Sequence, residues 1–210
     1  FGEKVSSDLC GPFPSSIVNK YVYAIVFHDA ATKQIYTYYL KDKTAGSVMD
    51  MLSAFQRDHS DKLEWNHGHV KLWHTDNGGE FVSNNLRDFC DLLGVRRRFS
   101  TPWVSQQNPH AERSWGSLLR TMRILFAESN VPENFWPYAM DTAAMLHNSL
   151  PSFVNPLCKS PYEMQCGVKP DLSKVRVWGV KCYYLLPDRD RASKLSPKAV
   201  SAVHLGRDPR

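Results

Sequence analysis

His74-Thr75-Asp76-Asn77-Gly78-Gly79-Glu80-Phe81 stands near the middle of this 210-residue chain and predicts more about its fold than any other stretch. It follows an apolar run that predicts a strand over 70–74, and Asn-Gly-Gly predicts a turn in which a positive φ costs little. Thirty-five residues separate Asp76 from Glu112, which stands at the head of a long helical pattern. We therefore expect one carboxylate at a strand end and another in the first turn of a helix.

A third carboxylate, Asp8, lies in a short run over 4–10 that predicts a strand. Two aspartates on strands and one glutamate on a helix can hold two hard divalent cations, and two such cations catalyse phosphodiester transfer. Asp8, Asp76 and Glu112 are therefore the candidate catalytic and metal-binding residues. Taken singly, each has a simpler interpretation: Asp8 as a surface residue, Asp76 as a turn residue, and Glu112 as an acid at the positive end of its helix.

The composition indicates a globular protein, with 42% hydrophobic and 22% charged residues. The net charge of +5 is compatible with a nucleic-acid partner but does not by itself indicate one. The five cysteines include no Cys-x-x-Cys pair, which predicts free thiols in a reducing compartment. No apolar run approaches 18 residues, so no membrane span is predicted. The chain begins with neither Met nor a signal peptide, and we expect it to be a piece of a longer protein.

The hydrophobic pattern on either side of the central stretch predicts alternating strands and helices. Strands are expected at 4–10, 21–27, 35–40, 70–74 and 95–100, and helices at 44–59, 83–93, 109–126, 132–150 and 160–166. The first three strands follow one another directly, so they should pair as an antiparallel meander, while helices join the later strands in parallel. If the first and fourth strands are neighbours, Asp8 and Asp76 meet on one face, and the helix that carries Glu112 can cross over them.

The sequence pattern changes in the C-terminal part, where strands are predicted. Residues 175–186 predict a strand with a bulge at Gly179, and 199–205 predict one more strand. We expect a mixed α/β domain over 1–170, followed by a partial β-rich segment over 171–210. That segment is too small to be stable alone, so it should pack on the first part or be truncated.

Several sequence blocks occur together in this chain. They are Asp8-Leu9-Cys10-Gly11-Pro12, residues 76–81, residues 105–113, Phe135-Trp136, residues 148–152, residues 160–163 and residues 176–182. Together they resemble the catalytic core of retrotransposon integrases of the copia type, over nearly the whole chain. The resemblance implies a ribonuclease H-like fold, in which a mixed sheet of antiparallel and parallel strands is flanked by helices.

The resemblance also implies a function. Such a domain uses two Mg²⁺ or Mn²⁺ ions to process the ends of double-stranded DNA and join them to target DNA. It implies a homo-oligomer without a membrane or small-molecule substrate, which acts inside the cell, in the nucleus, after a stage in cytoplasmic virus-like particles. The candidate DNA-binding residues are Asn77, Gln106, Gln107, Asn108, Arg113 and Arg123.

This sequence departs from the family at three positions. Pro109 replaces the usual Gly, and Ser114 and Gly116 stand where basic residues are common. These changes keep open an alternative, a catalytically inactive or domesticated relic that only binds nucleic acid. A plain ribonuclease H nuclease is disfavoured, because that family lacks the block around Glu112.

Four further residues or runs near these blocks have structural interpretations that we prefer. Arg96-Arg97-Arg98 is expected to be a solvated strand edge and Trp115 a core residue. Glu80 is expected to be a local hydrogen-bonding partner rather than a fourth metal ligand, and His110 an exposed residue without a role.

Overall fold

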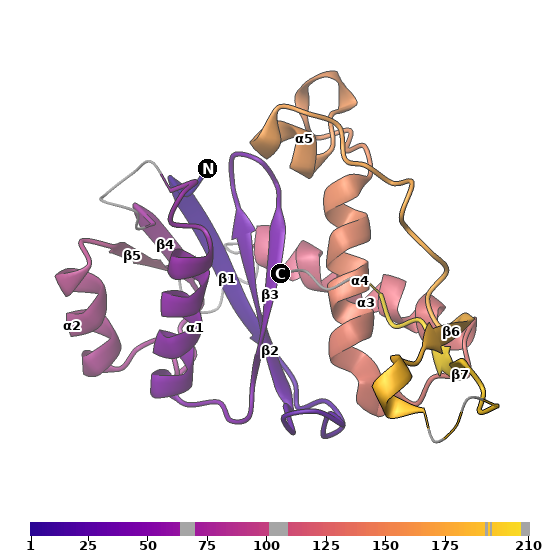
Figure 1. The fold of residues 1–210 in the computed structure, drawn as a ribbon. Helices are drawn as coiled ribbons and strands as arrows, with labels where there is room; N and C mark the ends of the chain where they lie inside the picture. The colour runs from indigo at the N-terminus through magenta and orange to yellow at the C-terminus, as the bar shows by residue number, and fades with distance from the viewer. Residues whose placement is uncertain (64–69, 101–108, 192, 194, 207–210) are drawn as a thin grey trace.

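The computed structural model describes residues 1–63, 70–100, 109–191, 193 and 195–206, and it has three layers (Figure 1). A five-stranded sheet lies in the middle. The helices α1 (Ala45–Asp58) and α2 (Asn84–Leu92) cover one face, and the helices α3 (Pro109–Ala127) and α4 (Trp136–Ser149) cover the other. The predicted α/β class is confirmed.

The strand order in the sheet is β3-β2-β1-β4-β5. The strands are β1 (Lys4–Cys10), β2 (Tyr23–Asp29), β3 (Ile35–Leu40), β4 (Leu72–Thr75) and β5 (Arg96–Phe99). β1, β2 and β3 pair antiparallel, whereas β4 pairs parallel with both β1 and β5. The predicted meander is confirmed, and so is the adjacency of the first and fourth strands.

The core beneath α1 and α2 is built from aromatic and aliphatic side chains. Phe27 of β2 stacks on Phe55 of α1 with ring centroids 4.7 Å apart, and Trp73 of β4 packs edge-on against Phe81. All four are buried. Because aromatic side chains bury large apolar areas, this cluster fixes α1 against the middle of the sheet.

Local hydrogen bonds fix the helix ends where the sequence predicts them. Thr44 accepts a hydrogen bond from the Ser47 N–H at 3.2 Å to cap α1, and Ser83 does the same for Leu86 of α2. Side-chain oxygens at these positions satisfy N–H groups that have no partner within the helix.

The second core lies between the sheet and the pair α3 and α4. Trp115, Leu118 and Met122 of α3 are buried there, as their helical spacing predicts, together with Trp136 of α4. Trp115 is only 6% exposed, so it is a core residue. The helix α4 is shorter than predicted, because residues 133–135 form a separate 3-10 turn before it.

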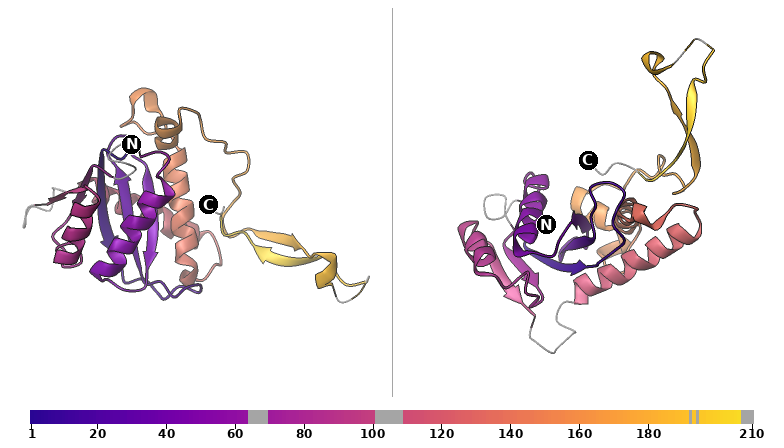
Figure 2. Two further views of the ribbon diagram at one scale, coloured as in Figure 1. Left: turned by 60° about the vertical axis from the view of Figure 1, so that its left-hand side comes forward. Right: turned by 90° about the horizontal axis from the view of Figure 1, so that it is seen from below.

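The C-terminal residues form a hairpin of β6 (Lys181–Leu185) and β7 (Ala199–Val203) that projects from the body of the molecule (Figure 2). The predicted strand over 175–186 is too long. Trp178 inserts into the second core and packs edge-on against Phe126, while Gly179 adopts a φ of +78° rather than forming a bulge. Insertion of a buried indole requires the chain to turn before it can pair, and a glycine makes the turn possible.

Before that hairpin, α5 (Pro161–Cys166) is capped by Ser160 and stopped by Gly167 in the left-handed conformation, as predicted. The five cysteines are all free. Within the described ranges no helix has both the length and the apolar character needed to cross a bilayer. The division of the chain near residue 170 stays a prediction.

Candidate active site

The register of the sheet brings two of the predicted carboxylates to the same edge. β1 and β4 are parallel, with Lys4 opposite Leu72 and Ser6 opposite His74. Two further residues along each chain lead to Asp8 and Asp76. Because side chains alternate between faces, Asp8 lies on the same face as Ser6, which is the face covered by α3. Asp8 and Asp76 therefore leave neighbouring strands at the same level.

The surroundings of Asp8 disfavour its ionised form. Burial first, then the charge of Asp76, with smaller contributions from the charges of Glu112 and Glu80, raise the pKa of Asp8 from 3.8 to about 6. The Leu9 N–H donates to Asp8 Oδ1 at 2.8 Å, and this hydrogen bond lowers the pKa of Asp8. Since a charge shifts a neighbour's pKa only from close by, the carboxylates form one electrostatic cluster.

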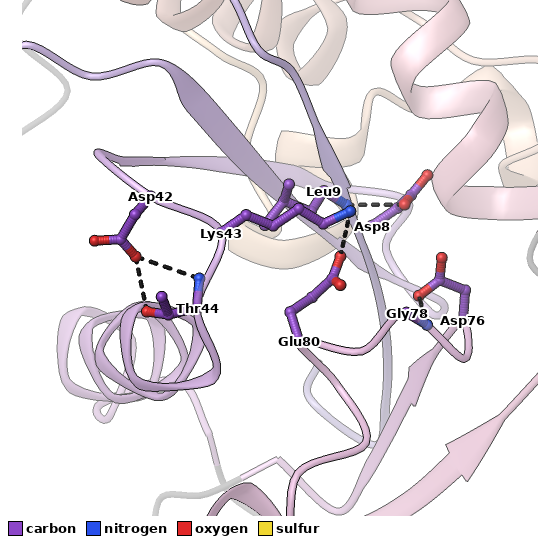
Figure 3. A network of polar contacts seen from close by, with 8 residues as sticks. All are labelled: Asp8, Leu9, Asp42, Lys43, Thr44, Asp76, Gly78 and Glu80. Atoms are coloured by element: carbon purple, nitrogen blue, oxygen red, sulfur yellow. Dashed lines mark hydrogen bonds and ion pairs between the residues drawn. The ribbon is translucent and has the colours of Figure 1, made fainter.

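Asp76 is held by the turn that follows β4. The Gly78 N–H donates to Asp76 Oδ1 at 3.1 Å, which closes a local turn around the carboxylate (Figure 3). The Asn77 side chain donates to the carbonyl of Ser100, just beyond β5. Asn77 therefore connects the ends of β4 and β5. The DNA contact expected of Asn77 stays a prediction.

Glu112 is an exposed residue in the first turn of α3. Its neighbours Ala111 and Ser114 are buried, and α3 packs on β1 and β2, so Glu112 stands at the border between the packed and the exposed side of the helix. In the described part of the chain no three histidine, cysteine or acidic side chains lie close enough together to hold a metal ion. The charges of Asp76 and Glu112 thus act on Asp8, but the three carboxylates are not close enough together to form a complete set of metal ligands.

Glu80 has a cationic partner. Its Oε1 lies 3.0 Å from Lys43 Nζ, and its side chain is only 7% exposed (Figure 3). The sequence predicts a local partner, but the partner lies 37 residues earlier in the chain. Sequence reasoning missed Lys43, which precedes α1 and has no motif that connects it with residues 76–81.

Gly78 leaves room for a neighbouring side chain. A turn follows Asp76, in which the Phe81 N–H donates to the Gly78 carbonyl at 2.8 Å, but neither Gly78 nor Gly79 uses the positive φ that glycine allows. A Cβ on Gly78 would come within 2.8 Å of the Glu80 carboxylate, whereas one on Gly79 would meet nothing within 4 Å. The glycine at 78 leaves room for the Glu80 side chain.

This difference predicts opposite effects for two matched substitutions. Gly78→Ala is expected to lower the free energy of unfolding by up to about 1 kcal/mol, because the flexible end of the Glu80 side chain must shift away from the new Cβ and from Lys43. Gly79→Ala is expected to be neutral or to stabilise by about 0.5 kcal/mol, because alanine restricts the unfolded chain. Urea unfolding measures both, and equal stabilities of the two variants would contradict the packing argument.

Apart from Asn77, the predicted DNA-binding residues divide into two groups. Gln106, Gln107 and Asn108 lie outside the described residues, as does the side chain of His110. Arg113 and Arg123 are exposed on α3, and Arg120, which sequence reasoning missed, lies on the same side of the helix. Arg120 could have been found from its spacing, because it lies seven residues after Arg113 and three before Arg123, which places all three on one side of a helix.

Two details modify the expected basic surface. Ser114 is buried, so a basic residue at this position would not reach the outer surface of α3. On the edge strand β5, Arg96 and Arg98 are exposed, but Arg97 donates to the Phe81 carbonyl and lies over the Phe99 ring. Arg97 is thus a structural residue.

A sheet of this strand order between two helical layers, with one acidic residue in β1 and another directly after β4, defines the ribonuclease H-like class. The crystal structure of the catalytic core domain of BIV integrase shares this fold, with a TM-score of 0.57, 17% identity and coverage of 80% of this chain and 95% of that one. A cryoEM structure of the simian T-cell lymphotropic virus intasome in complex with the PP2A regulatory subunit B56 gamma aligns with a TM-score of 0.61, 16% identity and coverage of 96% and 68%.

Residues 2–105 match the sequence model of the family described as integrase core domain. The retrovirus-related Pol polyprotein from transposon TNT 1-94 of Nicotiana tabacum is 28% identical over 203 residues, which are 96% of this chain and 15% of that polyprotein. The corresponding polyprotein from transposon RE2 of Arabidopsis thaliana is 30% identical over 193 residues, or 92% of this chain and 13% of its own length. Residues 2–105 thus match the integrase core domain, and the curated relatives, of which this chain spans about a sixth or less, are Pol polyproteins of Ty1/copia-type transposons.

Proposed function

We propose that this chain is the catalytic domain of a retrotransposon integrase that processes DNA ends and joins them to target DNA with the help of divalent metal ions. The observation that carries the proposal is the parallel register of β1 and β4, which leads to Asp8 and Asp76 side by side, beneath the helix that begins near Glu112. The family supports a polynucleotidyl transferase in general, and the two-step reaction is our inference.

The donor atoms fit a hard divalent cation. Asp8, Asp76 and Glu112 supply only carboxylate oxygens, which Mg²⁺ and Mn²⁺ prefer, and burial together with the charges of Asp76 and Glu112 raises the pKa of Asp8 in the absence of such a cation. These three residues would hold two ions, with the first turn of α3 approaching the two aspartates. When bound, two such ions activate the attacking oxygen and stabilise the leaving oxygen of a phosphodiester.

The proposed reaction needs no covalent intermediate with the protein. In the first step water attacks a phosphodiester near the DNA end, and the bond to the 3′ oxygen breaks to leave a free 3′-hydroxyl. In the second step this hydroxyl attacks a target phosphodiester, a new bond to phosphorus forms, and the target's own 3′ oxygen leaves with the proton. Arg113, Arg120 and Arg123 present their charges to DNA phosphates along the exposed side of α3.

The partners and location follow from the same proposal. The substrates are two double-stranded DNAs, the element's ends and the target. The working form is a homo-oligomer that acts in the nucleus after assembly in cytoplasmic particles. One of the structures that share the fold is an intasome, and this supports the expectation of an oligomer.

DNA joining tests the proposal. Labelled duplexes with the termini of the encoding element are incubated with Mg²⁺ and the chain in its full-length protein, and a parallel reaction contains EDTA. Cleaved and joined products only with Mg²⁺ are expected. DNA binding without products would instead favour the inactive relic. Cleavage of an RNA–DNA hybrid without joining would favour a ribonuclease H.

A further inference from the structure

An ion pair lies beside the candidate carboxylates. Lys43 Nζ and Glu80 Oε1 are 3.0 Å apart, and the Lys43 side chain is 48% exposed whereas that of Glu80 is 7% exposed. Figure 3 shows the Lys43 side chain extending from the loop before α1 to Glu80, on the side where Asp8 and Asp76 lie. The nearly buried partner is the acid, so Glu80 depends on Lys43 for a counter-charge.

The backbone on either side of Lys43 is held by side-chain hydrogen bonds. Asp42 Oδ1 accepts from Thr44 Oγ1 at 2.7 Å and from Ser47 Oγ at 2.6 Å, while Thr44 caps α1. These bonds tie the loop to the first turn of α1. The backbone position of Lys43 at the edge of the site is therefore fixed.

Both members of the pair lie beside the two aspartates (Figure 3). The pKa of Lys43 is raised first by its hydrogen bond to Glu80 and to a smaller extent by the charges of Glu80 and Asp76. Glu80 also follows Asp76 by four residues in the same connection. A free Glu80 carboxylate would thus be a further oxygen donor next to Asp8 and Asp76.

We propose that Lys43 is a positioning residue that keeps Glu80 out of the metal site, so that Asp8, Asp76 and Glu112 alone bind the ions. This inference rests on the proposed function. Three carboxylates, two divalent cations and one phosphodiester are together neutral. Three carboxylates leave the metal-loaded site with one positive charge that attracts the phosphodiester, whereas a fourth carboxylate ligand would make the site neutral and remove this attraction.

Metal affinity tests this role in the absence of DNA. Mn²⁺ binding is measured by isothermal titration calorimetry on the full-length protein. Lys43→Met is expected to tighten binding about tenfold, because Glu80 becomes available as a ligand. In a Glu80→Gln background, Lys43→Met is expected to change the affinity less than about threefold, because the field of a half-exposed ammonium is screened by water.

Three control variants separate the possible outcomes. Lys43→Arg keeps the ion pair and should bind Mn²⁺ like the parent, as should Lys41→Met, which removes an exposed lysine from the same loop. Asp76→Asn should abolish binding, which shows that the ion measured is the one at the aspartates. Thermal unfolding of each variant establishes that it is folded.

A purely structural ion pair predicts unchanged or weaker metal binding in Lys43→Met, and that result would overturn the inference. An equal effect of Lys43→Met with and without Glu80 would also overturn it, because Lys43 would then not act through Glu80. Absence of Mn²⁺ binding in the parent, or binding that Asp76→Asn does not affect, would refute the metal site of the proposed function itself.

Discussion

Replacement of Glu112 by glutamine is expected to lower the rate of DNA joining by at least about a thousandfold, while DNA binding and folding stay intact. Glutamine has nearly the same shape as glutamate but removes the negative charge and one strong oxygen donor. Glu112 is exposed in the first turn of α3, so its replacement leaves the buried side of the helix unchanged. The loss should therefore appear in catalysis and not in stability.

Glu128, which is exposed just beyond the other end of α3, provides the matched control. Glu128→Gln makes the same chemical change and should join DNA at the parent's rate. The measurement compares the rates of joining of labelled duplexes in Mg²⁺ and the affinity for the same DNA in Ca²⁺. Joining by Glu112→Gln within about tenfold of the parent would remove Glu112 from the proposed triad.

Asp8→Asn is expected to stabilise the metal-free protein by about 3 kcal/mol at pH 8. The folded structure raises the pKa of Asp8 from 3.8 to about 6, through burial first and the charge of Asp76 second. The folded state thus binds this proton more tightly than the unfolded state. The parent's stability from this group is complete below pH 3.8 and is lost as the pH rises through about 6. Asparagine does not titrate, so the variant avoids this loss.

The pH dependence distinguishes this effect from a simple change in packing. In urea unfolding with EDTA, the stability advantage of Asp8→Asn should be about 3 kcal/mol at pH 8 and fall below about 1 kcal/mol near pH 4. Asp50→Asn, an exposed position on α1, should show no such trend. A constant difference between parent and Asp8→Asn from pH 4 to pH 8 would contradict an electrostatic origin. The same variant should be inactive in joining, because it lacks one of the proposed metal ligands. A gain in stability together with a loss of activity is expected here, because a site for cations is unfavourable for folding when it is empty.

Local features of the sequence were enough to predict most of the elements. Thr44, Ser83 and Ser160 cap helices through hydrogen bonds to residues three positions away, so their role depends on neighbours in the chain alone. The buried stripe of α3 follows from the helical period in the same way. The sequence also placed Asp76 correctly at the end of a strand and Glu112 in the first turn of a helix.

Features that depend on space between distant segments required the tertiary structure. The adjacency of Asp8 and Asp76 arises from parallel pairing of strands that are far apart in the chain, and sequence could offer it only as a condition. The Glu80 carboxylate that lies beside Gly78 could not be foreseen from the sequence. Trp178 ended a predicted strand by entering a core made by α3 and α4.

The sequence by itself thus determined which residues form strands, helices and caps, and which acids are candidates for the site. The tertiary structure alone decided that Lys43, from the loop before α1, neutralises Glu80 beside those acids. The physical reason is range: caps and helical stripes are set by residues within a few positions. Counter-charges and packing space are set by segments that meet only after the sheet has assembled.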